Sequence, residues 1–382
     1  MSAMRVERAP TRSLLAKPEA GNWQAFDVQL AFYALALAVI GLLMAWTNST
    51  DGPLAPGSTF TRGLMWFAIG IVVFSLAAAF DHRWLRTFSW LLYAVIIGLL
   101  GLTLIVGITI NGAQRWVSFA GIQFQFSEFA KVLVLAVLAA FVAARREKLG
   151  SLSTLIGTGL IVGPPFLLVM IQPDLGTSLV FVSIVAGALF LSGASVRWMV
   201  VAAAAVVASL PIIWSVLKDY QRQRLLTFLD PTSDPQGTGY QVIQSQIAVG
   251  SGGIFGKGLT NSSQGAASFL PVQSTDFAFA VLLEELGFVG GIVVFLLFVG
   301  LIWRILLIGW RSESVFGVAF AGGAAAMITF QMLVNAGMVA GMMPVTGIPL
   351  PFITHGGSSL LSMAIVLGVL QSINIRRARP SW

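Results

Sequence analysis

The sequence predicts an all-α, polytopic membrane protein with about ten transmembrane helices and one long extracytoplasmic loop between helices 7 and 8. Of its 382 residues, 57% are apolar and only 10% are charged, and the mean hydropathy is +0.88. Because a soluble domain carries about a quarter charged residues, this composition favours a lipid environment. Apolar runs of roughly 17 to 25 residues, each long enough to cross the hydrocarbon core as a helix, recur along the chain.

Ten of these runs are expected to span the membrane. They cover approximately residues 26–46, 62–80, 88–110, 127–144, 153–171, 175–192, 196–216, 277–303, 314–340 and 354–375. The break at Gln172-Pro173-Asp174 leaves two interpretations open, because a proline there either separates two helices or kinks one longer re-entrant element. No repeat of a fixed period divides the chain, so residues 26–376 are predicted to form a single membrane domain.

The distribution of basic residues predicts that both termini are cytoplasmic. Residues 1–25 are rich in arginine and proline and are expected to form a cytoplasmic tail before a retained first helix. With that tail inside, 15 of the 22 Lys and Arg residues fall in the two tails and in alternate loops, as the positive-inside rule requires. Residues 377–382 then form a cytoplasmic C-terminal tail. We therefore expect a multi-pass membrane protein with its N- and C-termini on the cytoplasmic side.

The net charge of +7 does not indicate nucleic acid as a partner, since the basic residues lie at loop ends without interleaved aromatic residues. Topology and anionic lipids explain this charge more simply. The chain has no cysteine and only two histidines, so thiol chemistry is excluded and a zinc site is not expected. A divalent cation with oxygen ligands, Mg²⁺ or Mn²⁺, is compatible with the composition, and no organic cofactor is expected.

The long polar insertion at residues 217–275 is expected on the outer side. Loops of this length in compact proteins are usually functional or disordered, and this loop is rich in turn signals. It contains Arg222 and Arg224 near its start and a glycine run, Gly250 to Gly258, that includes Lys257. Repeated glycine lets backbone N–H groups approach a phosphate, although no Walker A pattern accompanies it.

Four charged residues lie at or near the outer ends of predicted spans. Glu128 and Lys131 are three residues apart on one helix face, and they form either a structural ion pair or a substrate-binding pair. Asp174 precedes a helix, where it either caps the helix or binds substrate. Arg115 stands beside a tryptophan, where it either anchors the chain at the membrane interface or binds an anionic head group.

Asp276 lies where the long loop returns to the membrane. The dipole of a helix N-terminus favours its ionised form and burial opposes it, so this carboxylate is either a poised base or a helix cap. Glu284 falls within about 80° of Asp276 around a continuous helix and is expected to line the same cavity. Glu285 points the opposite way, toward an interhelical or cytoplasmic partner. Charges at membrane depth are functional candidates because they are costly.

His355 and Ser358 open the last predicted span in a run rich in Gly and Ser. Small residues in this position either permit close helix approach or begin a broken helix that lines a polar cavity. Both interpretations remain open from the sequence.

Several of these segments belong to a longer series of motifs. The series contains Gly112–Trp116, Ser127–Lys131, Gln172–Thr177, Phe228–Pro231, Gly239–Gln241, Gln244-Ser245, Thr275–Phe277, Glu284–Gly287, Pro349–Phe352 and Gly356–Ser359. In this order and spacing the motifs resemble the SEDS family (shape, elongation, division and sporulation), polytopic membrane proteins that include RodA and FtsW. The resemblance runs from the first predicted span to Arg377. The glycine run from Gly250 is more similar to RodA, whereas Phe126 and His355 replace a proline and a tyrosine that are usual in the family.

The resemblance implies a peptidoglycan glycosyltransferase that polymerises lipid II at the outer face of the cytoplasmic membrane, for cell elongation and shape. Implied partners are lipid II, the undecaprenyl-pyrophosphate-linked glycan, a class B penicillin-binding protein as transpeptidase, and other membrane proteins of the elongation machinery. By resemblance, Asp276 is the catalytic base and the candidate ligand of a divalent cation. The residues implied in substrate binding are Arg115, Glu128, Lys131, Asp174, Arg222, Arg224, Lys257, Glu284 and Ser358.

Two other classes of function fit the same topology. A lipid II flippase would need polar residues across the full bilayer depth, whereas those in this chain gather toward the outer half, and it would be expected to show repeat symmetry. A non-catalytic scaffold for a cell-wall synthase would use the long loop as its binding surface and would leave Asp276 free to vary.

Overall fold

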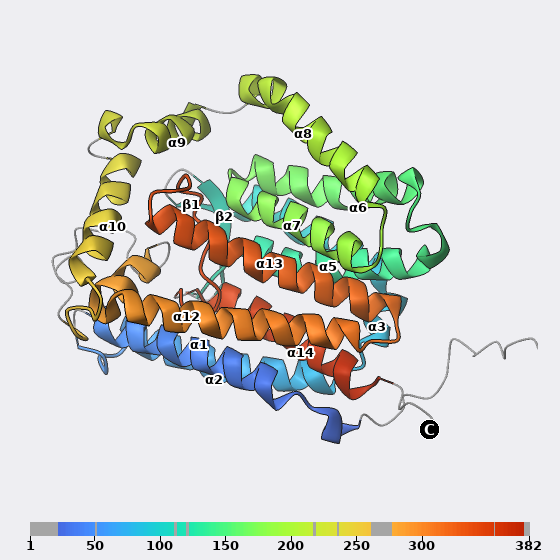
Figure 1. Ribbon diagram of the computed structural model, residues 1–382, viewed down its shortest axis with the longest axis horizontal. Helices are drawn as coiled ribbons and strands as arrows, with labels where there is room; N and C mark the ends of the chain where they lie inside the picture. Colours follow the sequence, from blue (N-terminus) through green and yellow to red (C-terminus); the bar gives the residue numbers. More distant parts are fainter. Residues whose placement is uncertain are drawn as a thin grey trace, which may run out of the picture.

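The computed structural model describes residues 22–49, 52–110, 113–119, 122–216, 219–234, 237–260, 277–354 and 356–377. Its main body is a bundle of long helices that run roughly along one axis (Figure 1). The long helices are α1 (Val28–Thr47), α2 (Thr59–Ala79), α4 (Ser89–Val106), α5 (Phe126–Ala144), α6 (Leu152–Ile171), α7 (Leu175–Leu191), α8 (Val196–Val216), α12 (Ala278–Trp310), α13 (Val315–Val339) and α14 (Gly357–Ile375).

Each of these helices overlaps one of the predicted spans. Among the described residues, eight are long and apolar enough to cross a membrane, and α7 and the apolar part of α8 (residues 196–209) are somewhat shorter. The prediction of a polytopic helical membrane protein is confirmed. The break near Pro173 separates two helices, because α6 ends at Ile171 and α7 begins at Leu175.

The interior of the bundle consists of α5, α13 and α14. In these helices 72% to 89% of the residues in an 18-residue apolar stretch are buried inside the protein. The corresponding share is 11% to 33% in α1, α2, α4, α6 and α12. Small residues permit the close packing, since a Cβ atom on Gly187 of α7 would lie 2.3 Å from the carbonyl oxygen of Gly322 on α13. The outer helices therefore present most of their apolar surface outward, as helices in contact with lipid do.

A small antiparallel sheet of order β1-β2-β3 follows α4 and is absent from the predicted all-α fold. It consists of β1 (Ile108–Ile110), β2 (Ala113–Phe119) and β3 (Ile122–Phe124). The prediction extended the third span to residue 110, but α4 ends at Val106. The side chain of Gln114 in β2 donates to the carbonyl oxygens of Leu104 and Gly107 at 3.3 and 2.9 Å. These bonds give hydrogen-bond donors to carbonyl oxygens at the C-terminal end of α4, where the helix supplies none. Strands this short carry too little alternation to be recognised from sequence.

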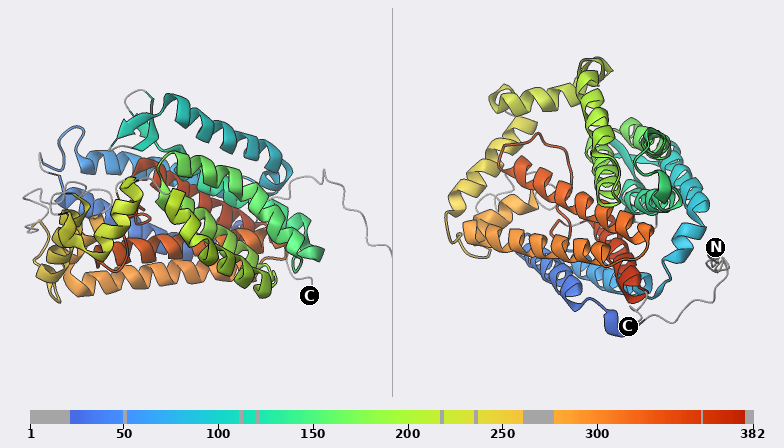
Figure 2. Two further views of the ribbon diagram at one scale, coloured as in Figure 1. Left: turned by 90° about the horizontal axis from the view of Figure 1, so that it is seen from above. Right: turned by 45° about the vertical axis from the view of Figure 1, so that its right-hand side comes forward.

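The predicted outer loop at residues 217–275 contains helical structure. Its described parts include α9 (Asp219–Leu229), the short 3₁₀ helix η3 (Pro231–Ser233) and α10 (Thr238–Gly252). In the right panel of Figure 2, α9 and α10 run from the end of α8 toward the start of α12. The described parts of this loop therefore form a helical bridge over one end of the bundle. The remaining short helices are η1 (Trp23–Ala25), α3 (Arg83–Thr87) and η2 (Arg146–Lys148).

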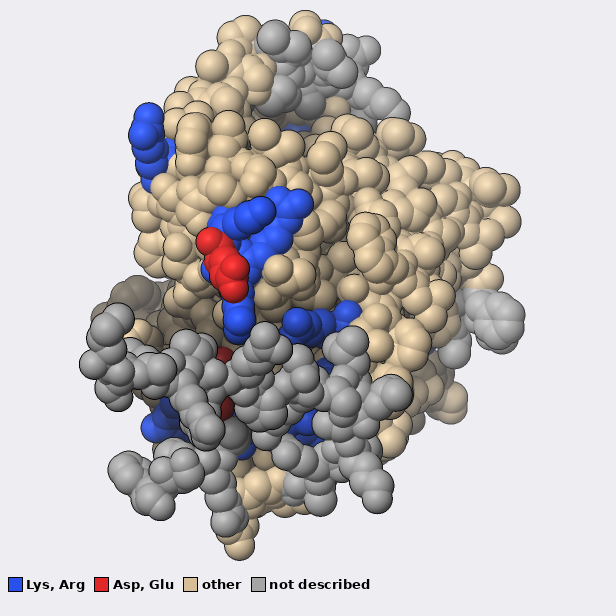
Figure 3. Space-filling model, turned by 90° about the vertical axis from the view of Figure 1, so that its right-hand side faces the viewer, with Lys and Arg blue, Asp and Glu red and all other residues tan. Residues whose placement is uncertain are grey.

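The two ends of the described chain meet at the opposite end of the bundle, where the backbone N–H of Asn22 donates to the carbonyl oxygen of Ile375 at 3.1 Å. This arrangement requires an even number of crossings, as predicted. Lys and Arg side chains gather on this end (Figure 3), which agrees with the distribution that predicts a cytoplasmic face. An ion pair between half-buried Arg304 and buried Asp27, with Nη2 and Oδ2 at 2.5 Å, joins α12 to the start of α1.

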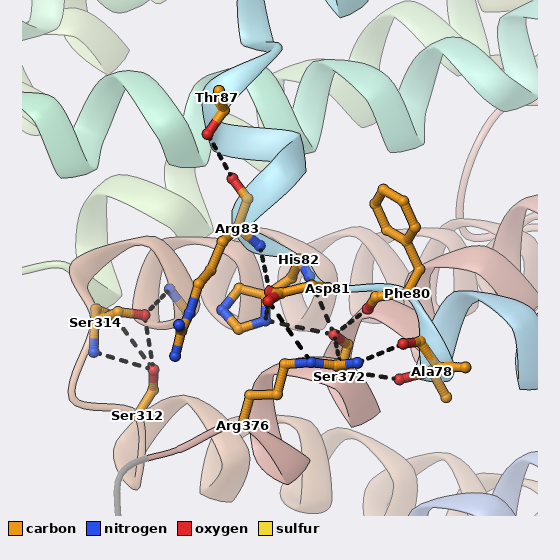
Figure 4. A network of polar contacts seen from close by, with 12 residues as sticks. Ala78, Phe80, Asp81, His82, Arg83, Thr87, Ser312, Ser314, Ser372 and Arg376 are labelled. Atoms are coloured by element: carbon orange, nitrogen blue, oxygen red, sulfur yellow. Dashed lines mark hydrogen bonds and ion pairs between the residues drawn. The ribbon is translucent and has the colours of Figure 1, made fainter. Parts of the chain in front are cut away.

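A second network at this end joins α14 to the segment after α2 (Figure 4). The hydroxyl of Ser372 donates to the carbonyl oxygen of Phe80 at 2.5 Å and accepts from the backbone N–H of His82 at 3.2 Å. Arg376 donates to the same hydroxyl at 2.8 Å and lies 3.9 Å from Asp81. Burial lowers the pKa of His82 to about 4, so its imidazole is neutral at physiological pH.

Candidate functional site

Asp174 is the centre of a polar cluster at the end of the bundle opposite the two described chain ends. It caps α7, since its carboxylate accepts from the backbone N–H of Thr177 at 3.1 Å and from the Thr177 hydroxyl at 2.9 Å. The helix-capping interpretation is confirmed. The same carboxylate also accepts from the Gln125 side chain at 3.0 Å and lies 3.6 Å from the Arg115 guanidinium. Asp174 therefore connects the small sheet, the start of α5 and the start of α7.

Arg115, on β2, has hydrogen-bonding capacity to spare. Its side chain is 21% exposed, and its ion-pair distance to Asp174 is longer than a hydrogen bond. Its Nε atom is buried and has no hydrogen-bond partner among the residues that the structure describes. A buried donor without an acceptor costs free energy unless a ligand or water satisfies it. The guanidinium is thus suited to bind an anion.

Glu128 and Lys131 form a buried ion pair in the first turns of α5. The ammonium of Lys131 donates to Glu128 Oε1 at 2.8 Å, and the two side chains are 1% and 2% exposed. The other carboxylate oxygen accepts from the Ser362 hydroxyl of α14 at 3.4 Å. The predicted pairing is confirmed, and the nearly complete burial shows that the ammonium is covered by protein in this conformation.

Two serines near the start of α14 contact the first turn of α5 and the residue before it. The hydroxyl of Ser358 accepts from the backbone N–H of Gln125 at 3.1 Å, and Ser362, one turn later, contacts Glu128. Two neighbouring positions on α14 thus hold the beginning of α5. We use "polar cluster" below for the residues joined in this way: Arg115, Gln125, Glu128, Lys131, Asp174 and Ser358.

A second charged pair links the long loop to α12. Lys257 Nζ lies 2.6 Å from Glu284 Oε1, and Glu284 also accepts from the Ser251 hydroxyl at 3.4 Å. Glu284 is fully buried, and the Lys257 side chain is 30% exposed. Glu285, the next residue, is buried as well. The structure therefore brings Lys257 and Glu284 together, as a pair on the loop side of α12.

The glycine run before Lys257 packs against a kink in α12. Gly287 has a positive φ of 67° inside this helix. The backbone groups that lose their helical hydrogen bonds at this kink bond to the loop instead. The N–H groups of Lys257 and Gly258 each donate at 3.0 Å to the carbonyl oxygens of Glu284 and Glu285. A Cβ atom on Gly256 would lie 2.1 Å from the Glu285 carbonyl oxygen, so glycine is needed for this approach.

The hypothesis that these amides hold a phosphate is therefore wrong for Gly256, Lys257 and Gly258. All three N–H groups donate to backbone carbonyl oxygens, that of Gly256 to Gly252 at 2.8 Å. The physical role of the glycines is close approach of two backbones rather than anion binding.

The two arginines of α9 make contacts with other parts of the chain. Arg222 donates to the carbonyl oxygens of Trp214 and Ser215 at 3.1 and 2.8 Å, at the end of α8. Arg224 donates to the carbonyl oxygen of Val345 at 3.3 Å. These bonds hold α9 against its surroundings, and they do not join either arginine to the polar cluster. A role of Arg222 or Arg224 in binding pyrophosphate remains a prediction.

Asp276 and His355 lie outside the described residues. The described chain resumes at Phe277, which is buried and forms the N-cap of α12, so Asp276 immediately precedes this helix. No group of three or more His, Cys, Asp or Glu residues lies together among the residues that the structure describes. A Mg²⁺ ion bound to one or two protein carboxylates usually takes its other oxygen ligands from water and from substrate phosphates. A cation at Asp276 remains a prediction.

Sequence reasoning did not single out Gln125 or Ser362, although both belong to the site. Gln125 precedes the apolar run of α5, which is a signal for a helix boundary, but its bond to Asp174 spans 49 residues. Ser362 lies inside an apolar span, where only the position of α5 decides that it faces Glu128.

Comparisons with known proteins agree with this architecture. A family model described as a cell cycle protein and named for FtsW, RodA and SpoVE matches residues 28–379. Peptidoglycan glycosyltransferase MrdB of Escherichia coli K12 is 39% identical over 353 residues, which cover 92% of this chain and 94% of that protein.

Two solved structures are similar along nearly the whole chain. A chain from a structure on coordination of polymerization and crosslinking by a peptidoglycan synthase complex has a TM-score of 0.77 at 33% identity, and the match covers 92% of this chain and 98% of that one. The Rod shape determining protein RodA of Thermus thermophilus has a TM-score of 0.69 at 28% identity, with 94% and 99% covered. The expectation drawn from the motifs is confirmed, and the chain belongs to the FtsW/RodA/SpoVE family, the SEDS proteins.

Proposed function

We propose that this protein is a peptidoglycan glycosyltransferase that polymerises lipid II into glycan strands, in the manner of RodA. The observation that carries the proposal is the polar cluster, in which a partly exposed arginine, Arg115, lies 3.6 Å from the buried carboxylate of Asp174 at one end of an apolar helical bundle. Relatives that match nearly the full chain are named peptidoglycan glycosyltransferases.

The chemistry requires a base for the acceptor hydroxyl and positive charge for the departing pyrophosphate. Asp276 takes the proton of the sugar hydroxyl as that oxygen attacks the anomeric carbon of the donor. The bond from the anomeric carbon to the pyrophosphate oxygen breaks, and the lipid pyrophosphate leaves. A single displacement inverts the anomeric centre, so no carboxylate nucleophile is needed.

Arg115 is the residue that best fits the leaving group. A guanidinium can bind a phosphate with two parallel hydrogen bonds, and the Arg115 side chain is partly exposed and lies farther from Asp174 than a hydrogen bond. Asp174 holds the guanidinium in place from 3.6 Å away. We therefore assign Arg115 to pyrophosphate binding and Asp174 to orienting it.

We assign Lys131 a supporting role, because in this conformation its ammonium is buried and cannot contact a substrate directly. Its ammonium is buried and bonded to Glu128, so it holds the buried part of the polar cluster together without reaching a head group. Lys257 and Glu284 hold the glycine run on α12, close in sequence to Asp276. Ser358 supports the cluster through Gln125.

A divalent cation bound at Asp276 would supply additional charge to neutralise the leaving pyrophosphate. Residues of this chain would hold and orient the substrate around it. The proposal includes Mg²⁺ or Mn²⁺ as the ion, because oxygen ligands suit both.

The reaction is placed at the outer face of the cytoplasmic membrane. This placement rests on the positive-inside distribution, which puts the polar cluster on the extracytoplasmic end. The proposed partner is a class B penicillin-binding protein acting as transpeptidase. A similar chain occurs in a peptidoglycan synthase complex, which supports such a partner. The proposed role in elongation follows from the similarity to rod-shape proteins.

The experiment compares native protein with Asp276→Ala and Asp276→Asn, each purified with its penicillin-binding partner and given lipid II and Mg²⁺. We expect glycan polymer from the native protein and none from either variant. Glu147→Ala, a change of an exposed carboxylate in the short η2 helix, serves as the matched control and should leave polymer unchanged. Polymer from the Asp276 variants would remove Asp276 from the chemistry. Lipid movement across the bilayer without polymer would favour a flippase instead.

A further inference from the structure

Two turns at the end of the bundle opposite the polar cluster form one surface. Helix α6 ends and α7 begins beside Asp174, so the start of α6 and the end of α7 lie at the other end of the bundle. The turn before α6 and the turn between α7 and α8 meet there, because Thr154 of the first and Trp198 of the second line the same crevice. We use "double turn" below for residues 145–155 and 192–199 together.

The double turn carries a net positive charge that the protein leaves largely without partners. It contains one acidic residue, Glu147, and four basic residues, which gives a net charge of +3; the basic residues are Arg145, Arg146, Lys148 and Arg197. Arg146 lies 4.0 Å from Glu147, but both side chains are exposed, so this pair is weak. No carboxylate pairs with Lys148 or Arg197 among the residues that the structure describes, and both are exposed.

Other basic residues at this end of the bundle are used by the fold. Arg304 is paired with Asp27, and Arg376 is paired with Asp81 and bonded to Ser372. The basic side chains of the double turn make no comparable contacts with buried carboxylates. Their charge is therefore available to a partner outside the protein, on the face where Lys and Arg side chains gather (Figure 3).

An exposed apolar strip begins at the double turn on each of two neighbouring helices. Leu152, Ile156 and Leu160 are exposed on α6, and Val196 and Val200 are exposed on α8. Residues four apart share one helix face, so each strip runs from the double turn toward the middle of the bundle. The α6 strip is about 12 Å long, close to the roughly 15 Å depth of one hydrocarbon leaflet. Two strips below one basic surface match the two acyl chains of a phospholipid.

Trp198 lies where the basic surface meets the strips. Its ring is half-buried, and the guanidinium of Arg197 lies 5.4 Å from the ring centroid. Tryptophan is enriched at the level where lipid head groups meet the hydrocarbon. The crevice that Trp198 lines has a volume of about 10 Å³, which is room for about one water molecule, so a head group lies across its mouth rather than inside it.

The apolar strips distinguish a lipid from an acidic protein segment. A soluble acidic peptide matches the charge of the double turn but leaves the strips on α6 and α8 uncovered. An anionic phospholipid matches both, and the cytoplasmic leaflet is the one with a negative surface potential.

We propose that the double turn binds an anionic phospholipid of the cytoplasmic leaflet. Arg146, Lys148 and Arg197 surround its phosphate, and its acyl chains lie along the strips of α6 and α8. This site lies at the opposite end of the bundle from the polar cluster and goes beyond the proposed glycosyltransferase activity, and it uses only the proposed orientation. A lipid bound across both turns holds the start of α8 against the start of α6.

The absence of cysteine from the chain lets a single thiol report on bound lipid. Val200→Cys places a thiol on the α8 strip, and Leu76→Cys places a control near the same end of α2; the native side chains are 61% and 65% exposed. Each full chain is labelled with bimane and reconstituted in nanodiscs that contain dibrominated phosphatidylglycerol or dibrominated phosphatidylcholine, whose bromine atoms quench the label on contact.

We expect phosphatidylglycerol to compete for position 200 at least about tenfold better than phosphatidylcholine, because each Lys or Arg near an anionic lipid contributes roughly fivefold. At position 76 the preference should be less than about threefold. A preference below threefold at position 200, or the same preference at both positions, would overturn the proposal. Release of the quenching at position 200 by soluble polyglutamate would instead identify an acidic protein segment as the occupant.

The basic residues are tested in the Val200→Cys background by two triple variants that remove the same charge. The preference should fall below about threefold in the variant that combines Arg146→Gln, Lys148→Gln and Arg197→Gln. It should stay above about fivefold in the control, which changes exposed residues elsewhere at this end and combines Arg86→Gln, Arg311→Gln and Arg377→Gln. Equal losses in both would show attraction by diffuse charge rather than a site, and no loss in the first would remove its residues from the site.

A charge-preserving variant separates lipid binding from folding. Arg146→Lys combined with Arg197→Lys keeps the positive charge, so the preference at position 200 should change less than about threefold. Thermal unfolding of each variant checks that it is folded. Quenching needs no catalysis, whereas polymer formation tests the proposed function, so failure of one is distinguishable from failure of the other.

Discussion

Neutralising the buried Glu128–Lys131 pair separates its structural role from its role in the reaction. Lys131→Met removes the ammonium but leaves the Glu128 carboxylate, which is 2% exposed and otherwise contacts the Ser362 hydroxyl. Glu128→Gln leaves the ammonium without its counter-ion. The double variant carries no charge at either position and keeps similar side-chain volumes.

The size of the effect follows from distance and burial. At 2.8 Å, two unit charges attract by about 6 kcal/mol with an effective dielectric constant of roughly 20, and the cost of desolvating both ions offsets much of this attraction. Removing one partner of a buried pair typically costs about 3 to 5 kcal/mol, because the other charge stays buried. Removing both is nearly neutral or stabilising when the replacements pack well. We therefore expect each single variant to be strongly destabilised and the double variant to be close to native.

The assay combines unfolding temperature with polymer formation. Thermal unfolding in detergent can be followed by intrinsic fluorescence, since the chain has 11 tryptophans. Each single variant should unfold at a clearly lower temperature, and the double variant should recover most of the loss. Despite its stability, the double variant should form glycan polymer at least about tenfold more slowly, because it lacks the Lys131 ammonium and the Glu128 carboxylate, which the family resemblance assigns to substrate binding.

Two results would refute this reasoning at different points. Single variants as stable as the native protein would show that the pair is not held in a low-dielectric interior. A stable double variant with native polymer formation would show that the pair only packs helices and that its charge plays no part in the reaction.

Three further predictions concern the kink, the buried histidine and the cation. Gly287→Ala should lower the free energy of unfolding by about 1 to 3 kcal/mol, because the φ of Gly287 is 67° and an added Cβ would lie 2.3 Å from the Gly256 nitrogen. The measurement is thermal unfolding, with Gly98→Ala as the control, since a Cβ at Gly98 would meet open space. Because burial lowers the pKa of His82 from 6.5 to about 4, the unfolded chain takes up this proton first as pH falls. The contribution of neutral His82 to the free energy of unfolding is complete above pH 6.5 and decreases by up to about 3 kcal/mol toward pH 4. The unfolding temperature of native protein should therefore fall more steeply between pH 7 and pH 5 than that of His82→Gln. The neighbouring charged residues Asp81, Arg83 and Arg376 are present in both proteins, so they do not account for the difference. Chelation with EDTA should abolish polymer formation and added Mg²⁺ or Mn²⁺ should restore it, whereas polymer formed at full rate in EDTA would exclude the proposed cation.

The long helices could be predicted from sequence because their signal is local. Each apolar run exceeds the length needed to cross the hydrocarbon core, and a helix satisfies its backbone polar groups within its own segment. The pairing of Glu128 with Lys131 was predictable for the same reason, since residues three apart on one helix are neighbours. The capping role of Asp174 also followed from its place before a helix.

The remaining features depend on contacts between segments far apart in the chain. The glycine run before Lys257 suggested a phosphate loop, but its N–H groups are used by the kinked backbone of α12, which no local pattern specifies. The bonds from Gln125 to Asp174 and from Ser362 to Glu128 join residues 49 and 234 positions apart.

The sequence by itself determined the membrane class, the order of the helices, the expected orientation and the family, because hydrophobic length, charge distribution and motif order are properties of the linear chain. Only the tertiary structure decided which charged residues meet, and that Lys131 is covered by protein while Arg115 stays partly exposed. The physical reason is that helix packing, and not spacing along the chain, sets the burial and the partners of each side chain.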